Sequence, residues 1–117
     1  MLRPLILKGT YHNQIAGYLF SKGYMQEAAE LYESLAQQDP ANAETWQKLG
    51  FAYQKNKLYD KAVKAYVQAD ALKANHLWTL KHLAQCHKLS GNYSQAAFCF
   101  QKVLEFDPDN LHILMQT

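Results

Sequence analysis

The chain of 117 residues repeats itself with a period of 34 residues. Three blocks, residues 9–42, 43–76 and 77–110, can be written under one another without a gap. Small residues recur at the eighth and twentieth positions of each block, and aromatic residues recur at the twenty-fourth. By position these are Ala16, Gly50 and Ala84, then Ala28, Ala62 and Ala96, then Tyr32, Tyr66 and Phe100. A fixed period of this length predicts a stack of similar helical units rather than one globular core.

Each block has the apolar spacing of two helices. In the middle block, Trp46, Leu49, Gly50 and Tyr53 are spaced i, i+3, i+4 and i+7, which places them on one face of a helix. Asn42 precedes this helix as a predicted N-cap. A second helix with the same kind of spacing follows residues 55–57. Because short turns join such helices, each pair is expected to pack antiparallel, with the small residues allowing close approach.

These residues resemble the tetratricopeptide repeat family. The pattern Trp46-x2-Leu49-Gly50-x2-Tyr53, followed by Ala62-x3-Tyr66, is similar to the family pattern, and the resemblance extends over residues 9–110. It implies an all-α fold in which antiparallel helix pairs stack as a right-handed superhelical solenoid of three repeats plus the start of a fourth helix pair. The departures from the pattern affect local packing only; they are His12, Leu19, Ala74, Leu80 and His87.

The two ends are interpreted separately from the three repeats. Residues 1–8 form an N-terminal segment that could belong to a preceding helix, and residues 111–117 begin a further helix that stops early. An array of repeats needs a terminal helix with a polar outer face to stay soluble. We therefore expect the chain to be part of a longer protein, unless both ends are simply frayed.

A second stripe of residues lies on the other side of each first helix. The resemblance implies that this stripe lines a concave, peptide-binding groove. The groove residues expected on this basis are Asn13, Phe20, Gln47, Phe51, Gln54, Lys55, Trp78, Lys81, Gln85 and Lys88. Aromatic anchors surrounded by polar groups are typical of recognition surfaces. The alternative is that Phe20 and Phe51 pack sideways into neighbouring repeats and Trp78 against the truncated helix.

The polar groove residues indicate what kind of segment would bind. The lysines favour a ligand with apolar residues and nearby acids, and Gln54 and Gln85 could bond an extended peptide's main chain. Family members that clamp the C-terminal Glu-Glu-Val-Asp of heat-shock chaperones need a set of Lys, Asn and basic side chains. That carboxylate clamp is absent, because its positions hold Asn13, Gly17, Lys48, Trp78 and His82.

The leading hypothesis is therefore a protein–protein interaction module that binds a partner peptide or helix. The main rival is a structural segment that extends a longer array, or self-associates through exposed array ends, in a larger enzyme or sensor. A bacterial secretion chaperone is a third possibility, weakened by the lack of an acidic balance. A related helical-repeat family that reads RNA has a similar period, but its basic surface and coding positions are not apparent.

Other function classes find little support. The sequence has no phosphate-binding glycine loop, paired carboxylates or nucleophile motif, so we expect no enzyme activity and no cofactor. His82 and Cys86 have a possible metal-ligand spacing, but Cys86 falls in a helix interior and His87 is expected to be a satisfied core histidine. Pairing of Cys86 with Cys99 stays open. The net charge of +2 favours neither nucleic acid nor membrane, and a cytoplasmic location is expected.

Overall fold

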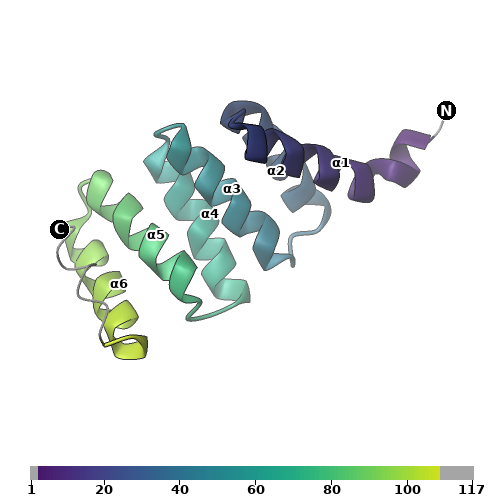
Figure 1. Cartoon of the computed structure of the whole chain (residues 1–117). Helices are drawn as coiled ribbons and strands as arrows, with labels where there is room; N and C mark the ends of the chain where they lie inside the picture. The colour runs from purple at the N-terminus through teal and green to yellow at the C-terminus, as the bar shows by residue number, and fades with distance from the viewer. Residues whose placement is uncertain (1–2, 109–117) are drawn as a thin grey trace.

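The computed structural model describes residues 3–108, with side chains from residue 12 onward. This part of the chain forms six helices: α1 (Arg3–Lys22), α2 (Met25–Gln38), α3 (Ala43–Lys55), α4 (Tyr59–Leu72), α5 (Leu77–Leu89) and α6 (Tyr93–Phe106). Each helix packs against the next one in sequence, and α3 also contacts α5. The helices therefore form an elongated stack of antiparallel pairs (Figure 1). The expected all-α helical-repeat solenoid is confirmed.

The stack has two long faces, which we name by their helices. The odd-helix face is formed by α1, α3 and α5, and the even-helix face by α2, α4 and α6 (Figure 1). Residues 3–8, predicted from the sequence to belong to a separate N-terminal segment, are helical and continuous with α1. The truncated helix expected at residues 111–117 lies outside the described residues. No helix within residues 3–108 is both long and apolar enough to cross a membrane.

The interior of the central pair depends on the recurring small and aromatic positions. A Cβ atom added at Gly50 would lie 2.8 Å from the ring of Tyr66, so α3 and α4 approach too closely there for any larger residue. Tyr66 and Ala62 are fully buried. The close approach expected from the repeat pattern is therefore present, with the aromatic ring of α4 packed directly against the backbone of α3.

Local hydrogen bonds fix where the helices begin. The Oδ1 atom of Asn42 accepts hydrogen bonds from the backbone N–H groups of Glu44, at 3.1 Å, and Thr45, at 3.4 Å, which confirms it as the N-cap of α3. The indole Nε1 of Trp46 donates to the carbonyl oxygen of Pro40 at 2.9 Å. The loop that closes the first block is therefore attached to the helix that opens the second.

The turns show how departures from the repeat pattern are tolerated. Gly23 and Gly91 follow α1 and α5 with φ of 89° and 84°, the left-handed region in which glycine ends a helix at little cost. At the end of the second block, Ala74 stands where the first and third blocks have Pro40 and Pro108, and Asn75 next to it adopts φ 63°. Its backbone N–H donates to Oδ1 of Asp70 at 3.2 Å. An asparagine in the left-handed region and one side-chain acceptor thus close this block without proline.

Two tyrosines at the same repeat position differ in their hydrogen bonding. The hydroxyl of Tyr66 donates to Oε1 of Gln54 at 2.7 Å, whereas the buried hydroxyl of Tyr32 has no partner among the described residues.

We expect Tyr66→Phe to lower the free energy of unfolding by about 0.5–1.5 kcal/mol, because a buried hydrogen bond is lost. Tyr32→Phe should be neutral or stabilising. Urea unfolding of both variants checks this, and equal destabilisation would contradict the assigned hydrogen bonds.

Candidate functional site

A row of aromatic rings crosses the odd-helix face. Phe20 on α1 and Phe51 on α3 have ring centroids 5.3 Å apart, and Phe51 and Trp78 on α5 are 6.0 Å apart. His82 lies one turn further along α5, and its ring centroid is 4.2 Å from that of Trp78. We call Phe20, Phe51, Trp78 and His82 the aromatic row. Trp78 is 38% exposed and the other three are half-buried. The rings therefore pack sideways on one another and also reach the surface.

Buried tyrosines of the even-numbered helices support this row from below. The ring of Tyr32 lies edge-on to Phe20, with centroids 6.1 Å apart. The ring of Tyr66 lies edge-on to Trp78, with centroids 5.9 Å apart, and stacks on His82, with centroids 6.0 Å apart. Both tyrosines are almost fully buried. The residues of the twenty-fourth repeat position thus hold the surface rings in fixed places, and the same helix pairing that forms the core also forms the site.

Gln54 links the row to the core through its side-chain carbonyl. Its Oε1 accepts the hydrogen bond from Tyr66 and lies 3.1 Å from Nδ1 of His82. Because this oxygen has no proton to give, Nδ1 of His82 is the donor and Nε2 is left as an acceptor. The expectation that Gln54 would bond a peptide main chain must be corrected for this oxygen, which is committed inside the molecule.

Positive charge surrounds the aromatic row. The Nζ atom of Lys55 lies 5.2 Å from the centroid of the Phe51 ring, and that of Lys48 lies 6.0 Å from Phe20. Glu44 forms a salt bridge with Lys48 at 3.7 Å, so the positive charge of Lys48 is partly compensated. Burial, and after it the charges of Lys55 and Lys81, lower the pKa of His82. His82 is therefore a neutral hydrogen-bond acceptor at neutral pH.

The remaining predicted groove residues lie around the row rather than in it. Asn13 is exposed on α1, and Nε2 of Gln47 lies 3.4 Å from Nδ1 of His76. Lys81 and Gln85 are half-buried on α5. Lys88 lines a separate cavity of about 480 Å³ on α5 and α6, which contains no member of the row. The structure thus brings together Phe20, Phe51, Gln54, Lys55 and Trp78.

His82 is the site residue that sequence reasoning missed. The sequence offers it as a metal ligand and at one position of the absent carboxylate clamp, but it also follows Trp78 by four residues and therefore lies on the same face of α5. Its neighbours Phe51 and Gln54 come from α3. The ring centroids of His82 and Phe51 are 5.5 Å apart. The spacing to Trp78 was available from the sequence, but the contacts with α3 depend on how two helix pairs stack.

The buried titratable groups near the row do not form a reactive site. Cys86 and Cys99 are free and buried, and burial raises the pKa of Cys86 to about 12, so its thiol stays protonated. His87 is 8% exposed, and burial lowers its pKa. Its Nδ1 has no hydrogen-bond partner in the described part of the chain. The expectation of a satisfied core histidine is therefore confirmed for burial, but within these residues it does not hold for the hydrogen bond of Nδ1.

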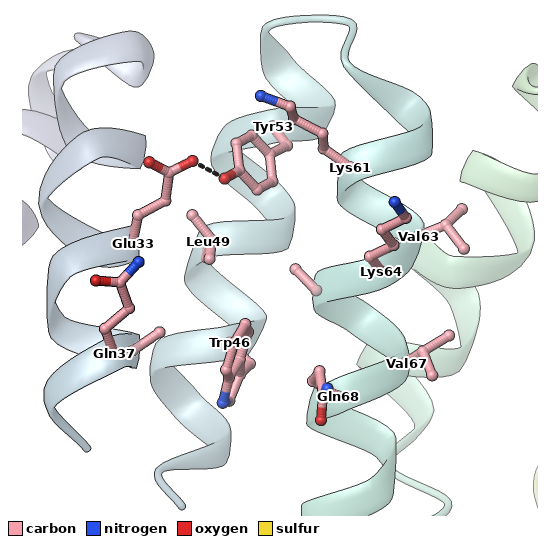
Figure 2. A pocket seen from close by; sticks show the side chains of 12 residues that line it. Glu33, Gln37, Trp46, Leu49, Tyr53, Lys61, Val63, Lys64, Val67 and Gln68 are labelled. Atoms are coloured by element: carbon pink, nitrogen blue, oxygen red, sulfur yellow. Dashed lines mark hydrogen bonds between the residues drawn. The ribbon is translucent and has the colours of Figure 1, made fainter. Parts of the chain in front are cut away.

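The opposite face carries a groove that no sequence pattern predicts. It has a volume of about 730 Å³ and lies between α2 and α4, with α3 as its floor (Figure 2). Trp46, Leu49 and Tyr53 form the floor, and the hydroxyl of Tyr53 donates to the carboxylate of Glu33 on α2. We call this depression the even-helix groove. It exists because α2 and α4 each pack on α3 but stand apart from one another.

Comparisons with known proteins agree with this architecture. A profile of the tetratricopeptide repeat matches residues 39–109. Mouse BBSome complex member BBS4 is 31% identical over 101 residues, and mouse Superkiller complex protein 3 is 26% identical over 102 residues. The aligned regions cover 86% and 87% of this chain but only 19% and 6% of those relatives.

One solved structure has a similar fold over most of its length. It is the second TPR domain of human RPAP3, determined in complex with an HSP70 peptide. The two structures superpose with a TM-score of 0.83 at 23% sequence identity, and the match covers 93% of this chain and 91% of the RPAP3 domain. At this level of identity the likeness concerns the fold.

Proposed function

Because the chain belongs to the tetratricopeptide repeat family, we propose that it is a protein–protein interaction module whose odd-helix face binds a segment of a partner protein. The observation that carries this proposal is the aromatic row, which crosses α1, α3 and α5 without a break. Solenoids of stacked helix pairs present extended surfaces of this kind to their ligands. An extended segment or a helix could contact several of these rings at once.

The mechanical support of the row favours binding. Partly exposed aromatic rings supply much apolar contact area, and interface hot spots are enriched in such residues. Tyr32 and Tyr66 hold the rings from below, so little side-chain entropy remains to be lost when a ligand binds. Trp78, the most exposed ring of the row at 38%, is proposed as the central anchor, with Phe51 beside it.

The charges around the row indicate the chemistry of the partner. Lys55 and Lys48 lie against the edges of the row, and Lys81 lies on the same helix as Trp78. A segment with aromatic or aliphatic side chains and nearby Asp or Glu residues complements this surface. The RPAP3 domain was solved with an HSP70 peptide, but here the apolar row, rather than a carboxylate clamp, is proposed to provide most of the affinity.

The remaining proposals concern the margins of the site and its setting. Asn13, Gln47, Gln85 and Lys88 are proposed as peripheral contacts of a longer ligand. We propose no catalytic role and no cofactor for this chain. A cytoplasmic location is also proposed, supported by the two free cysteines.

Selection from a displayed library of random peptides tests this function. We expect the chain to enrich sequences that combine an aromatic or aliphatic residue with Asp or Glu. Reversing the charge of the row's margin with Lys55→Glu and Lys81→Glu should weaken a selected peptide about 3- to 10-fold at low salt and less at high salt, because exposed charges mainly change the association rate.

A matched double variant on the other face provides the control. Lys61→Glu with Lys64→Glu makes the same change in net charge on the even-helix face and should leave peptide affinity unchanged. Failure to enrich any sequence, or peptides that respond to the even-face variant instead, would contradict the proposed binding face.

A further inference from the structure

The two walls of the even-helix groove carry opposite charge. On α2, Glu33 and Gln37 line the groove, and the exposed Glu30 lies one turn before Glu33. The helix sequence contains three glutamates and no basic residue. This wall therefore carries negative charge at Glu33 and Glu30 and no positive charge.

The opposite wall is basic. Lys61 and Lys64 of α4 line the groove and are exposed, whereas the two acids of α4, Asp60 and Asp70, are not among its lining residues. Figure 2 shows Glu33 at about the same height along the groove as Lys61 and Lys64, on the other side of Tyr53. At this level the groove thus has an acid on one side and two bases on the other.

These charges do not neutralise one another within one molecule. Glu33 accepts the hydrogen bond of Tyr53, and Nζ of Lys61 lies 5.6 Å from the centroid of the same ring. Within residues 12–108 the structure records no ion pair across the groove. Tyr53 therefore stands between the two walls, and both rows of charge remain available to a partner that bridges the groove.

A second copy of the chain has the charge pattern that complements the walls of this groove. Since α3 is antiparallel to both α2 and α4, those two helices run in the same direction. A rotation of 180° about an axis parallel to α3 places α2 of one copy over α4 of the other, so that acidic and basic walls face each other twice. A two-fold axis perpendicular to the helices would instead oppose like walls.

We propose that the even-helix groove is the interface of a two-fold symmetric homodimer. In this arrangement the floor residues of α3, Trp46 among them, lie along the axis. Nε1 of Trp46 is already bonded to Pro40, so its half-buried ring can enter an apolar contact without an unsatisfied donor. The charged walls surround that centre. Such an isologous interface repeats every contact twice, and it leaves both odd-helix faces free for ligands.

Sedimentation equilibrium over a series of protein concentrations tests the proposal. We expect the wild-type chain to form a dimer that weakens as ionic strength rises, because the contacts at the rim are exposed charges. Lys61→Glu with Lys64→Glu makes both walls acidic and should weaken the dimer at least about tenfold, since like charges then oppose one another. Glu30→Lys with Gln37→Lys makes both walls basic, keeps the Glu33–Tyr53 bond, and should have the same effect.

Mixing the two charge-reversed variants is the decisive step. In the mixed dimer the acidic α2 of one variant faces the basic α4 of the other, and the reversed walls also face one another, so association should return to the wild-type level. Lys22→Glu with Lys73→Glu, which makes the same change in net charge at exposed sites outside the groove, should dimerise normally. A chain that is monomeric at every concentration overturns the proposal. A dimer whose stability is unchanged by both charge reversals also overturns it, because such a dimer would form through another surface, such as an end of the array. A mixture of the two variants that fails to associate overturns it as well.

Discussion

Ala62→Leu is expected to lower the free energy of unfolding by about 1–3 kcal/mol, as overpacking of a close-packed interior usually does. Ala62 has no exposed surface and lies on α4, which packs against both α3 and α5. The space beside it is limited, because Gly50 and the ring of Tyr66 already fix the separation of α3 and α4. A leucine therefore has to push the two helices apart. Thermal and urea unfolding monitored by circular dichroism measure the loss.

A substitution two residues away serves as the control. Lys64 is exposed on the same helix, so Lys64→Leu should change the free energy of unfolding by less than about 0.5 kcal/mol in dilute solution. If both leucine variants unfold alike, Ala62 is not the close-contact site of the pair, and the repeat assignment loses its main structural support.

The fold could be predicted from sequence because the residues that recur at fixed positions of the repeat are the ones that contact one another. Gly50 and Tyr66 recur in register with equivalent residues in the other blocks, and the structure places them in direct contact. Asn42 has the local geometry of an N-cap, which depends only on neighbouring residues. Ile15 shows the limit of the pattern: it is 47% exposed, while its equivalents Leu49 and Leu83 are buried. No second helix precedes α1 in the described residues to cover it.

The site could be predicted only in part. The spacing along α1, α3 and α5 was enough to select Phe20, Phe51 and Trp78, since residues of one helix face remain on that face. The partners of Gln54 were not predictable, because Tyr66 and His82 are 12 and 28 residues away and meet it only through the stacking of two helix pairs. The even-helix groove was missed for the same reason: it arises from the distance between α2 and α4.

Removing the two central anchors should have the largest effect on binding. Truncation of an anchoring aromatic at an interface commonly costs about 2 kcal/mol or more, which is roughly 30-fold in affinity. We therefore expect Phe51→Ala with Trp78→Ala to abolish measurable binding of a peptide selected on the wild-type chain. Both rings also contact His82, so the double variant will lose some stability as well.

Two further variants separate binding from folding. Phe51→Leu with Trp78→Leu keeps apolar volume beside His82 and should remain folded, yet it removes the aromatic faces and should bind at least tenfold more weakly, as interface truncations of this size do. Phe98 on α6 is 62% exposed and lies outside the aromatic row, so Phe98→Ala should leave affinity unchanged.

Titration calorimetry of one selected peptide against the wild-type chain and these three variants, with a thermal melt of each, tests the central claim most directly. The account predicts a folded double-leucine variant with weakened binding, no measurable binding by the double-alanine variant, and wild-type affinity for Phe98→Ala. Wild-type affinity in a folded double-leucine or double-alanine variant would show that the ligand does not bind through the aromatic row, and would contradict the proposed function.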